Sequence, residues 1–186
     1  MKQLRICVDT NIWIDYLRVS IGAKKSKQLL RLLTDFKNPH VLVIPKILFL
    51  ELMYKLIDAK KDEYLIREKE FSAYDLKISE GKAKKFEIPL PTREMKDVIN
   101  ILGEIQSYQR VEIVTTAIDF SKVEYLVKEG FELLDSMIIM QTSNSIDFLV
   151  TKDKIVRKIN GIKKEWLKFK ATTSSGMINI LDKSLN

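Results

Sequence analysis

Four short apolar segments, rich in β-branched residues, alternate along this chain with longer segments of helical character. The apolar segments cover residues 4–8, 41–44, 112–117 and 147–151, and helices are expected at 11–18, 24–36, 46–59, 94–108, 120–129, 132–143 and 154–159. Strands separated by helices favour a parallel sheet, because each connection has to cross one face of the sheet. The pattern predicts an α/β fold with a mostly parallel central sheet of four strands, or five if residues 177–181 add another.

Local signals mark several helix ends. Pro45 directly precedes the helix expected at 46–59, which is a favoured position for proline. Asp119 is placed to cap the helix at 120–129, and Gly130 is placed to end it. Residues 60–94 differ from the rest in their dense mixed charge, and we expect them to form a helical insertion.

The composition indicates one soluble domain with a polyanionic partner. The chain has 186 residues and a formal net charge of +7, an excess that favours nucleic acid. Its single cysteine, Cys7, lies in the first apolar segment, so no intrachain disulfide can form and a reducing cytoplasm is expected. No stretch approaches 18 uncharged apolar residues, so no membrane span is expected. The single histidine, His40, follows Asn-Pro in an expected turn and provides no metal cluster.

Four acidic residues stand in apolar surroundings. Asp9 follows the first predicted strand and Asp153 follows the fourth, where the carboxyl ends of parallel strands form a crevice. Glu51 and Asp135 lie within segments expected to be buried, apolar helices. Each has an ordinary structural explanation: Asp9 as a helix cap, Glu51 as the partner of a buried lysine, Asp135 as a residue near a late helix start, and Asp153 as a turn residue.

Taken together, the four acids suggest a cation site. Carboxylates that converge repel one another, and a bound cation reverses that repulsion. Hard oxygen ligands suit Mg²⁺ or Mn²⁺, and zinc is disfavoured because no histidine or cysteine accompanies the acids as a ligand. The sequence therefore predicts a site for Mg²⁺ or Mn²⁺ if the four acids converge, with Asp9 as one wall of it.

Three stretches of the chain resemble the PIN domain, a family that includes the VapC-type ribonuclease toxins. They are VDTNIWIDYL, LFLELMYKL and LLDSMIIMQTSNSIDFLVTKDK, and the resemblance covers roughly residues 4–58 and 111–160. It implies a three-layer α/β/α fold. It also implies that one or two Mg²⁺ or Mn²⁺ ions are held by Asp9, Glu51, Asp135 and Asp153. Asn11 and Thr151 would support this site through hydrogen bonds. Two features depart from a compact VapC toxin: the longer region after Glu51 and the tail beyond residue 160.

The resemblance implies an endoribonuclease that hydrolyses RNA phosphodiester bonds, either as the toxin of a toxin–antitoxin pair or as an RNA-processing nuclease. It implies a nuclease domain over residues 1–160, with residues 60–94 as its insertion and residues 161–186 as an extension packed on the same domain. An antitoxin protein and a second copy of the chain stay open as partners. The alternatives are a non-catalytic PIN-like module that binds RNA or acts as a scaffold, and a different Mg²⁺ phosphohydrolase.

A basic segment directly follows the predicted strand at 147–151. Residues 152–170 contain eight Lys or Arg residues, with Trp166 and Phe169 among them. Basic residues beside a metal site suit contacts with RNA phosphates, and the two aromatic residues could stack on bases. The alternative is a solvated helix face whose aromatic residues belong to the core, and we favour the core for the two aromatic residues. The residues predicted to bind nucleic acid are Lys152, Lys154, Arg157, Lys158, Lys163 and Lys164.

Overall fold

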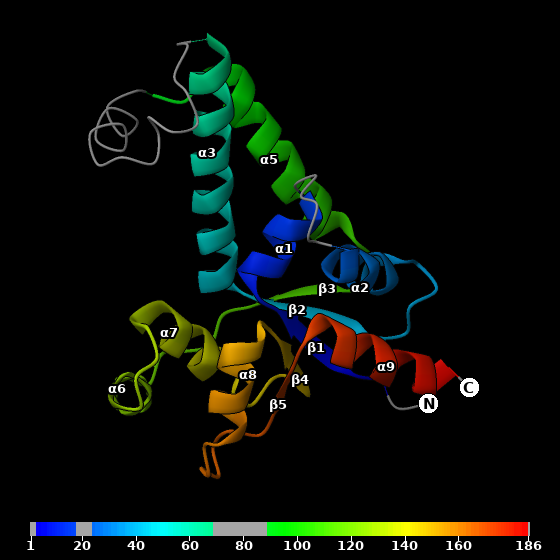
Figure 1. Ribbon diagram of the computed structural model, residues 1–186, viewed down its shortest axis with the longest axis vertical. Helices are drawn as coiled ribbons and strands as arrows, with labels where there is room; N and C mark the ends of the chain where they lie inside the picture. The colour runs from blue at the N-terminus through cyan, green and yellow to red at the C-terminus, as the bar shows by residue number, and fades with distance from the viewer. Residues whose placement is uncertain (1–2, 18–23, 69–88, 186) are drawn as a thin grey trace. The chain divides into compact units, whose positions relative to one another are not determined.

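The structure of the protein is a computed structural model that describes residues 3–17, 24–68 and 89–185 (Figure 1). The chain divides into two compact units. The first unit comprises Met1–Leu50 and Gln106–Asn186, and the second comprises Glu51–Ile105. No helix within the described residues is long and apolar enough to cross a membrane.

A parallel five-stranded sheet forms the centre of the first unit, as the sequence predicts. Its strands are β1 (Arg5–Val8), β2 (Val41–Pro45), β3 (Val111–Val114), β4 (Phe148–Val150) and β5 (Lys170–Thr172), in the spatial order β3-β2-β1-β4-β5. Every neighbouring pair is parallel. The three central strands contribute fully buried side chains to the core, among them Ile6, Cys7, Val43 and Val150.

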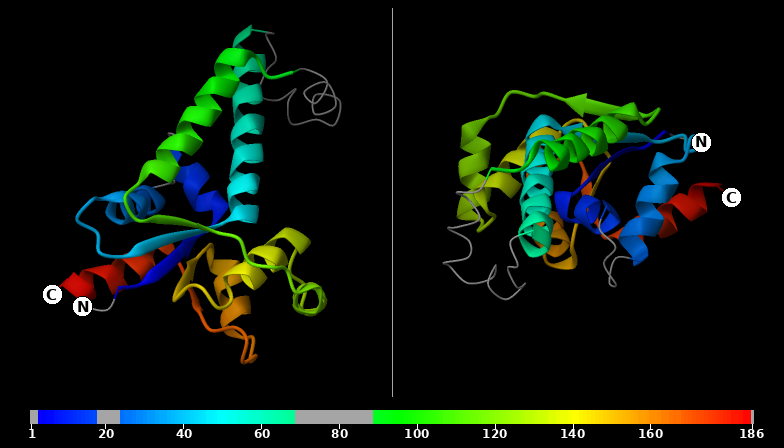
Figure 2. Two further views of the ribbon diagram at one scale, coloured as in Figure 1. Left: turned by 180° about the vertical axis from the view of Figure 1, so that it is seen from behind. Right: turned by 90° about the horizontal axis from the view of Figure 1, so that it is seen from above.

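Helices cover both faces of this sheet, which gives the predicted three layers. On one face lie α1 (Thr10–Leu17) and α2 (Lys24–Thr34), and on the other lie α6 (Phe120–Lys128), α7 (Leu133–Thr142) and α8 (Asp153–Asn160) (Figures 1 and 2). The last helix, α9 (Ser174–Leu185), packs against α2. From β1 the chain adds β2 and β3 on one side, and it then returns to add β4 and β5 on the other. The point where the strand order reverses therefore lies between β1 and β4, and binding crevices form beyond the carboxyl ends of such strands.

The end of the chain differs from its prediction. Residues 177–181 were expected as a strand, but they belong to α9, and the fifth strand is Lys170–Thr172 instead. The buried residues Met177, Ile178 and Leu181 show why, because their spacing of one and four residues places them on one face of a helix. The strand β5 escapes prediction since its three residues contain only one buried side chain, Ala171.

In the described part of the second unit, two antiparallel helices lie side by side (Figures 1 and 2). Helix α3 (Lys46–Glu68) begins in the first unit and continues into the second, and α5 (Thr92–Ser107) completes the pair. The apolar part of this helix was expected to be buried. Leu48 and Leu52 are fully buried, but Leu50 is 42% exposed, so that expectation holds for one face only. Of the predicted helical insertion at 60–94, residues 60–68 continue α3 and residues 92–94 begin α5, whereas 69–88 lie outside the described residues.

Gly130 ends α6 as predicted, and its conformation requires glycine. Its φ of 82° lies in the left-handed region. The N–H of Gly130 donates to the carbonyl of Val127 (2.8 Å), and the N–H of Phe131 donates to that of Leu126 (3.1 Å), which is the Schellman pattern. Asp119 caps the other end of α6 by accepting the N–H of Ser121.

Replacing Gly130 by alanine should therefore lower the free energy of unfolding by about 1–2 kcal/mol, the cost of a left-handed alanine. Gly103→Ala is the matched control. Gly103 lies within α5, and nothing stands within 4 Å of the Cβ that alanine would add, so this change should stabilise by about 0.5–1 kcal/mol. Urea denaturation of both variants measures the change in the free energy of unfolding that each causes. If both variants were destabilised, or both were stabilised, the conclusion that position 130 requires glycine would be contradicted.

Candidate functional site

Asp9 stands at the point where β1 ends and α1 begins. Its backbone N–H donates to the carbonyl of Val150 at 2.9 Å, so it extends the pairing of β1 with β4 by one residue. One carboxylate oxygen, Oδ1, accepts the N–H of Asn11 at 2.8 Å, which is the bond of a helix cap. The capping explanation of Asp9 is thus correct, but it uses only one of the two carboxylate oxygens.

Thr151 binds the second oxygen. Its hydroxyl donates to Oδ2 of Asp9 at 2.6 Å, the length of a charge-assisted hydrogen bond. Thr151 is only 2% exposed, and its N–H donates to the carbonyl of Thr172 in β5. The two residues meet because β1 and β4 pair with Val8 opposite Val150, so that the residues following each strand are neighbours. Asp9 thus accepts one hydrogen bond from the backbone of Asn11 and one from the hydroxyl of Thr151, and the supporting roles of these two residues stay a prediction.

Asp135 lies in the first turn of α7 rather than in the interior of the helix. The cap of α7 is Glu132, so Asp135 is the third helical residue. A carboxylate is favoured there by the partial positive charge of the helix N-terminus. Aspartate is unfavourable in the interior of a helix, but this does not apply to a residue of the first turn. Its neighbour Ser136 is fully buried and donates its hydroxyl to the carbonyl of Glu132.

Glu51 lies on α3 and belongs to the second unit. Its carboxylate pairs with the ammonium of Lys55 at 2.7 Å, one helical turn further along. The side chain of Glu51 is 16% exposed and that of Lys55 is 39% exposed. An acid four residues before a lysine stabilises a helix. Glu51 therefore has a lysine partner, but this lysine is partly exposed rather than buried as the sequence suggested.

Asp153 is the first residue of α8, two residues beyond Thr151, and its side chain lies outside the described residues. Among the side chains that the structure does describe, no three of the His, Cys, Asp and Glu type lie close enough together to hold a metal ion. The predicted ligand set includes Asp153 and also Glu51 of the second unit, so convergence of the four acids stays a prediction. In chemical type the set suits Mg²⁺ or Mn²⁺, since every donor is a carboxylate oxygen.

A shallow cleft of about 700 Å³ adjoins Thr151. It opens beyond the carboxyl ends of β4 and β5, and the first turns of α8 and α9 form part of its wall. Lys152 and Lys154 line it and are exposed. The other residues around it are Ile12, Asp15, Ser26, Ile155, Thr173, Ser174 and Ser175. A cleft with two lysines beside Asp9 and Thr151 suits an anionic ligand, and the hydroxyl groups of its wall were not identified from the sequence.

The remaining basic residues divide into separate groups. Lys158 donates to the carbonyl of Gly130 and lies 4.5 Å from the ring centroid of Phe131. Lys164 lies 4.6 Å from the ring centroid of Tyr125. These two lysines therefore contact α6 and the turn that follows it, whereas Lys152 and Lys154 line the cleft.

Arg157 and Lys163 are exposed. Of the two aromatic residues in this segment, Phe169 is buried and Trp166 packs edge-on against Tyr125. Both aromatic side chains thus contribute to packing, which is the structural role that the sequence left open for them.

Comparison with known proteins shows the family. A family model described as the PIN domain matches residues 6–162, most of the chain. The chain belongs to the PIN domain family. PIN domains are generally nucleases and typically depend on divalent metal ions, so hydrolysis is the kind of reaction this membership supports.

A similar solved structure is that of VapBC2 from Rickettsia felis bound to a DNA fragment from their promoter. It matches this PIN domain with a TM-score of 0.50 and 13% sequence identity, over 91% of this chain and 98% of the other. At that identity the likeness shows the fold alone. No curated protein matches the chain.

The Thr151 hydroxyl should contribute measurably to stability. Thr151→Val keeps the shape of the side chain but leaves Oδ2 of Asp9 without this donor, and it should lower the free energy of unfolding by about 1–2 kcal/mol. Thr151→Ser keeps the hydroxyl and should lose less. Thermal and urea denaturation of the two variants test this, and a valine variant at least as stable as the serine variant would contradict it.

Proposed function

We propose that this PIN domain is a metal-dependent endoribonuclease that hydrolyses RNA phosphodiester bonds. The observation that carries the proposal is the hydrogen bond from Thr151 to Asp9, at the point of the sheet where the strand order reverses and beside a basic cleft. This is the place where parallel α/β folds bind their ligands. Family membership supports hydrolysis as the kind of reaction.

The residues proposed to hold one or two Mg²⁺ or Mn²⁺ ions are Asp9, Glu51, Asp135 and Asp153. A divalent ion at such a site neutralises charge on the phosphate and lowers the pKa of an attacking water. Asn11 and Thr151 hold the carboxylate of Asp9 in one orientation through its two oxygens. A fixed carboxylate suits metal binding, because a ligand that is already oriented loses little conformational freedom on binding.

A thiol nucleophile is not part of the proposed reaction. Cys7 is fully buried in β1, and burial, together with the nearby charge of Asp9, raises the pKa of its thiol well above the usual range. A buried neutral thiol is unreactive. The attacking group in the proposal is therefore water, and the acids carry the chemistry.

We propose that the RNA backbone follows the cleft, with phosphates against Lys152 and Lys154. Arg157, Lys158, Lys163 and Lys164 extend the basic surface in the proposal. We also propose that residues 161–186 extend the domain of residues 1–160, because β5 completes the sheet and α9 packs on α2. The solved VapBC2 complex supports a protein antitoxin as a candidate partner, alongside a second copy of this chain.

Cleavage should depend on both the metal and the acids. With structured and unstructured RNAs, cleavage should occur in Mg²⁺ or Mn²⁺ and stop in EDTA. Asp135→Asn should reduce the rate by at least about 100-fold while RNA binding persists. Glu124→Gln is the control, since it removes a carboxylate that is exposed on α6 and paired with Lys128. If Asp135→Asn cleaved at the wild-type rate while the cleft still bound RNA, the alternative of a non-catalytic RNA-binding module would replace this proposal.

RNA affinity should depend most on the two cleft lysines. Changing Lys152 and Lys154 to Gln should weaken binding and flatten its salt dependence, by about 0.7 in the log–log slope for each lost phosphate contact. The matched pair, Lys158→Gln with Lys164→Gln, removes the same charge from residues that contact aromatic rings, and it should change the slope less. Fluorescence anisotropy at several salt concentrations measures both slopes. If both pairs of substitutions gave the same slope of affinity against salt concentration, the proposed path of the RNA backbone along the cleft would be excluded.

A further inference from the structure

One acid stands in the basic cleft that adjoins Thr151. Asp15 lies in the second turn of α1 and lines the cleft together with Lys152 and Lys154, and it is the only acid among the described side chains of this lining. A carboxylate repels phosphates, so it lowers the affinity of the cleft for the anionic backbone that we propose as its ligand. The presence of Asp15 therefore needs an explanation that phosphate binding does not provide.

Ser26 binds one oxygen of this carboxylate. Its hydroxyl donates to Oδ2 of Asp15 at 3.3 Å, with Ser26 buried and Asp15 half-buried. In the described part of the chain this is the only hydrogen bond or ion pair of Asp15, so neither Lys152 nor Lys154 pairs with it there. A structural role, the connection of α1 to the start of α2, accounts for Oδ2. The other oxygen, Oδ1, is left to accept a donor from a ligand in the cleft.

The lining of the cleft suits the sugar–phosphate backbone of a nucleic acid rather than its bases. Among the described residues of the lining there is no aromatic ring on which a base could stack. Ile12 and Ile155 provide apolar contact for a sugar, and the hydroxyl groups of Thr173, Ser174 and Ser175 can donate to phosphate oxygens. The ligand groups that meet Asp15 are therefore those of the backbone.

Ribose has a hydrogen-bond donor that deoxyribose lacks. Within a strand, the 2′-hydroxyl is the only O–H group of the sugar–phosphate backbone, so it is the only backbone donor that Asp15 can meet. A hydrogen bond from a hydroxyl to a carboxylate is charge-assisted and stronger than one between neutral groups. With RNA this bond offsets the repulsion between Asp15 and the phosphates, whereas with DNA nothing offsets it.

We propose that Asp15 selects RNA over DNA by accepting a hydrogen bond from a ribose 2′-hydroxyl at Oδ1. The proposal rests on the proposed function, because it requires an RNA backbone in this cleft, and it adds a residue that determines specificity. Asp15 follows Asp9 by nearly two turns of helix, about 9 Å along the axis. It therefore contacts a sugar beside the reacting phosphate and takes no part in the reaction itself.

Oligonucleotides that differ only at the 2′ position test this directly. Fluorescence anisotropy in EDTA, where metal-dependent cleavage cannot occur, compares oligouridylate with its 2′-fluoro and 2′-deoxy forms. The 2′-fluoro form keeps the sugar conformation of RNA but has no donor. The wild-type protein should bind oligouridylate roughly tenfold more tightly than either comparison. Equal affinity for oligouridylate and its 2′-fluoro form would overturn the proposal.

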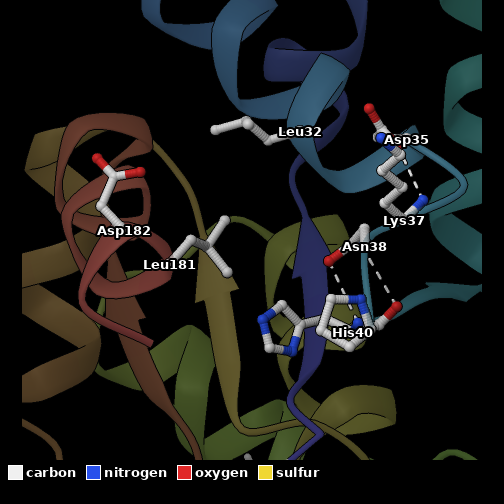
Figure 3. Close-up of a pocket in the computed structure, with 8 residues that line it drawn as sticks. Leu32, Asp35, Lys37, Asn38, His40, Leu181 and Asp182 are labelled. Atoms are coloured by element: carbon white, nitrogen blue, oxygen red, sulfur yellow. Dashed lines mark hydrogen bonds between the residues drawn. The ribbon is translucent and has the colours of Figure 1, made fainter. Parts of the chain in front are cut away.

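Substitution of Asp15 assigns the preference for ribose to this carboxylate. Asp15→Ala should reduce the preference to about twofold or less and should strengthen binding of the 2′-deoxy form, because the repulsion is lost with the acceptor. Asp15→Asn keeps the shape of the side chain and an acceptor without the charge, and it should give an intermediate preference. The control is Asp35→Ala, which removes an exposed carboxylate from a separate pocket beyond the end of α2 and should keep the wild-type preference (Figure 3).

The outcomes separate this inference from the proposed function. If an Asp15 variant with the wild-type melting temperature kept the full preference for ribose, the inference would be overturned even where Mg²⁺-dependent cleavage persisted. Equal gains in affinity for the ribose and 2′-deoxy strands in both variants would show a carboxylate that only repels, and would also overturn it. If the preference depended on Asp15 but RNA were not cleaved in Mg²⁺ or Mn²⁺, the nuclease proposal would fail and the role of Asp15 would stand.

Discussion

The hydrogen bond between Thr151 and Asp9 joins the carboxyl ends of two strands that are far apart in sequence. It sits where β1 pairs with β4, the one place in the sheet where the strand order reverses. The other carboxylate oxygen of Asp9 caps α1 through the N–H of Asn11. One side chain therefore connects a strand, the neighbouring strand and a helix start, and the arrangement around the candidate active site depends on it.

This arrangement explains how a carboxylate can stand between two apolar segments. Asp9 is half-buried, and the partial loss of its contact with water is compensated by hydrogen bonds from a backbone N–H and a hydroxyl. The same two donors hold the carboxylate still. Lys152 and Lys154 follow Thr151 in the chain and line the adjoining cleft together with the carboxylate of Asp15, so positive charge exceeds negative charge in its lining.

Much of the architecture could be predicted from local sequence. The alternation of strands and helices, the cap at Asp119 and the helix end at Gly130 depend on nearby residues only, and the structure agrees. Two predictions about the secondary structure at the end of the chain were wrong, and the local residue pattern explains both. Residues 177–181 are helical because their buried side chains follow helical spacing, and β5 carries too short an apolar pattern to be recognised.

The sequence by itself determined that the fold is α/β and that Asp9 follows a buried strand, because both depend on patterns spanning a few residues. Tertiary structure alone decided that Thr151 would meet Asp9, since that contact depends on the register of two strands over 140 residues apart in the chain. It also directed Lys158 to Phe131 and buried the side chain of His40. Strand pairing and side-chain packing are interactions between distant residues, and local periodicity carries no information about which distant segments come together.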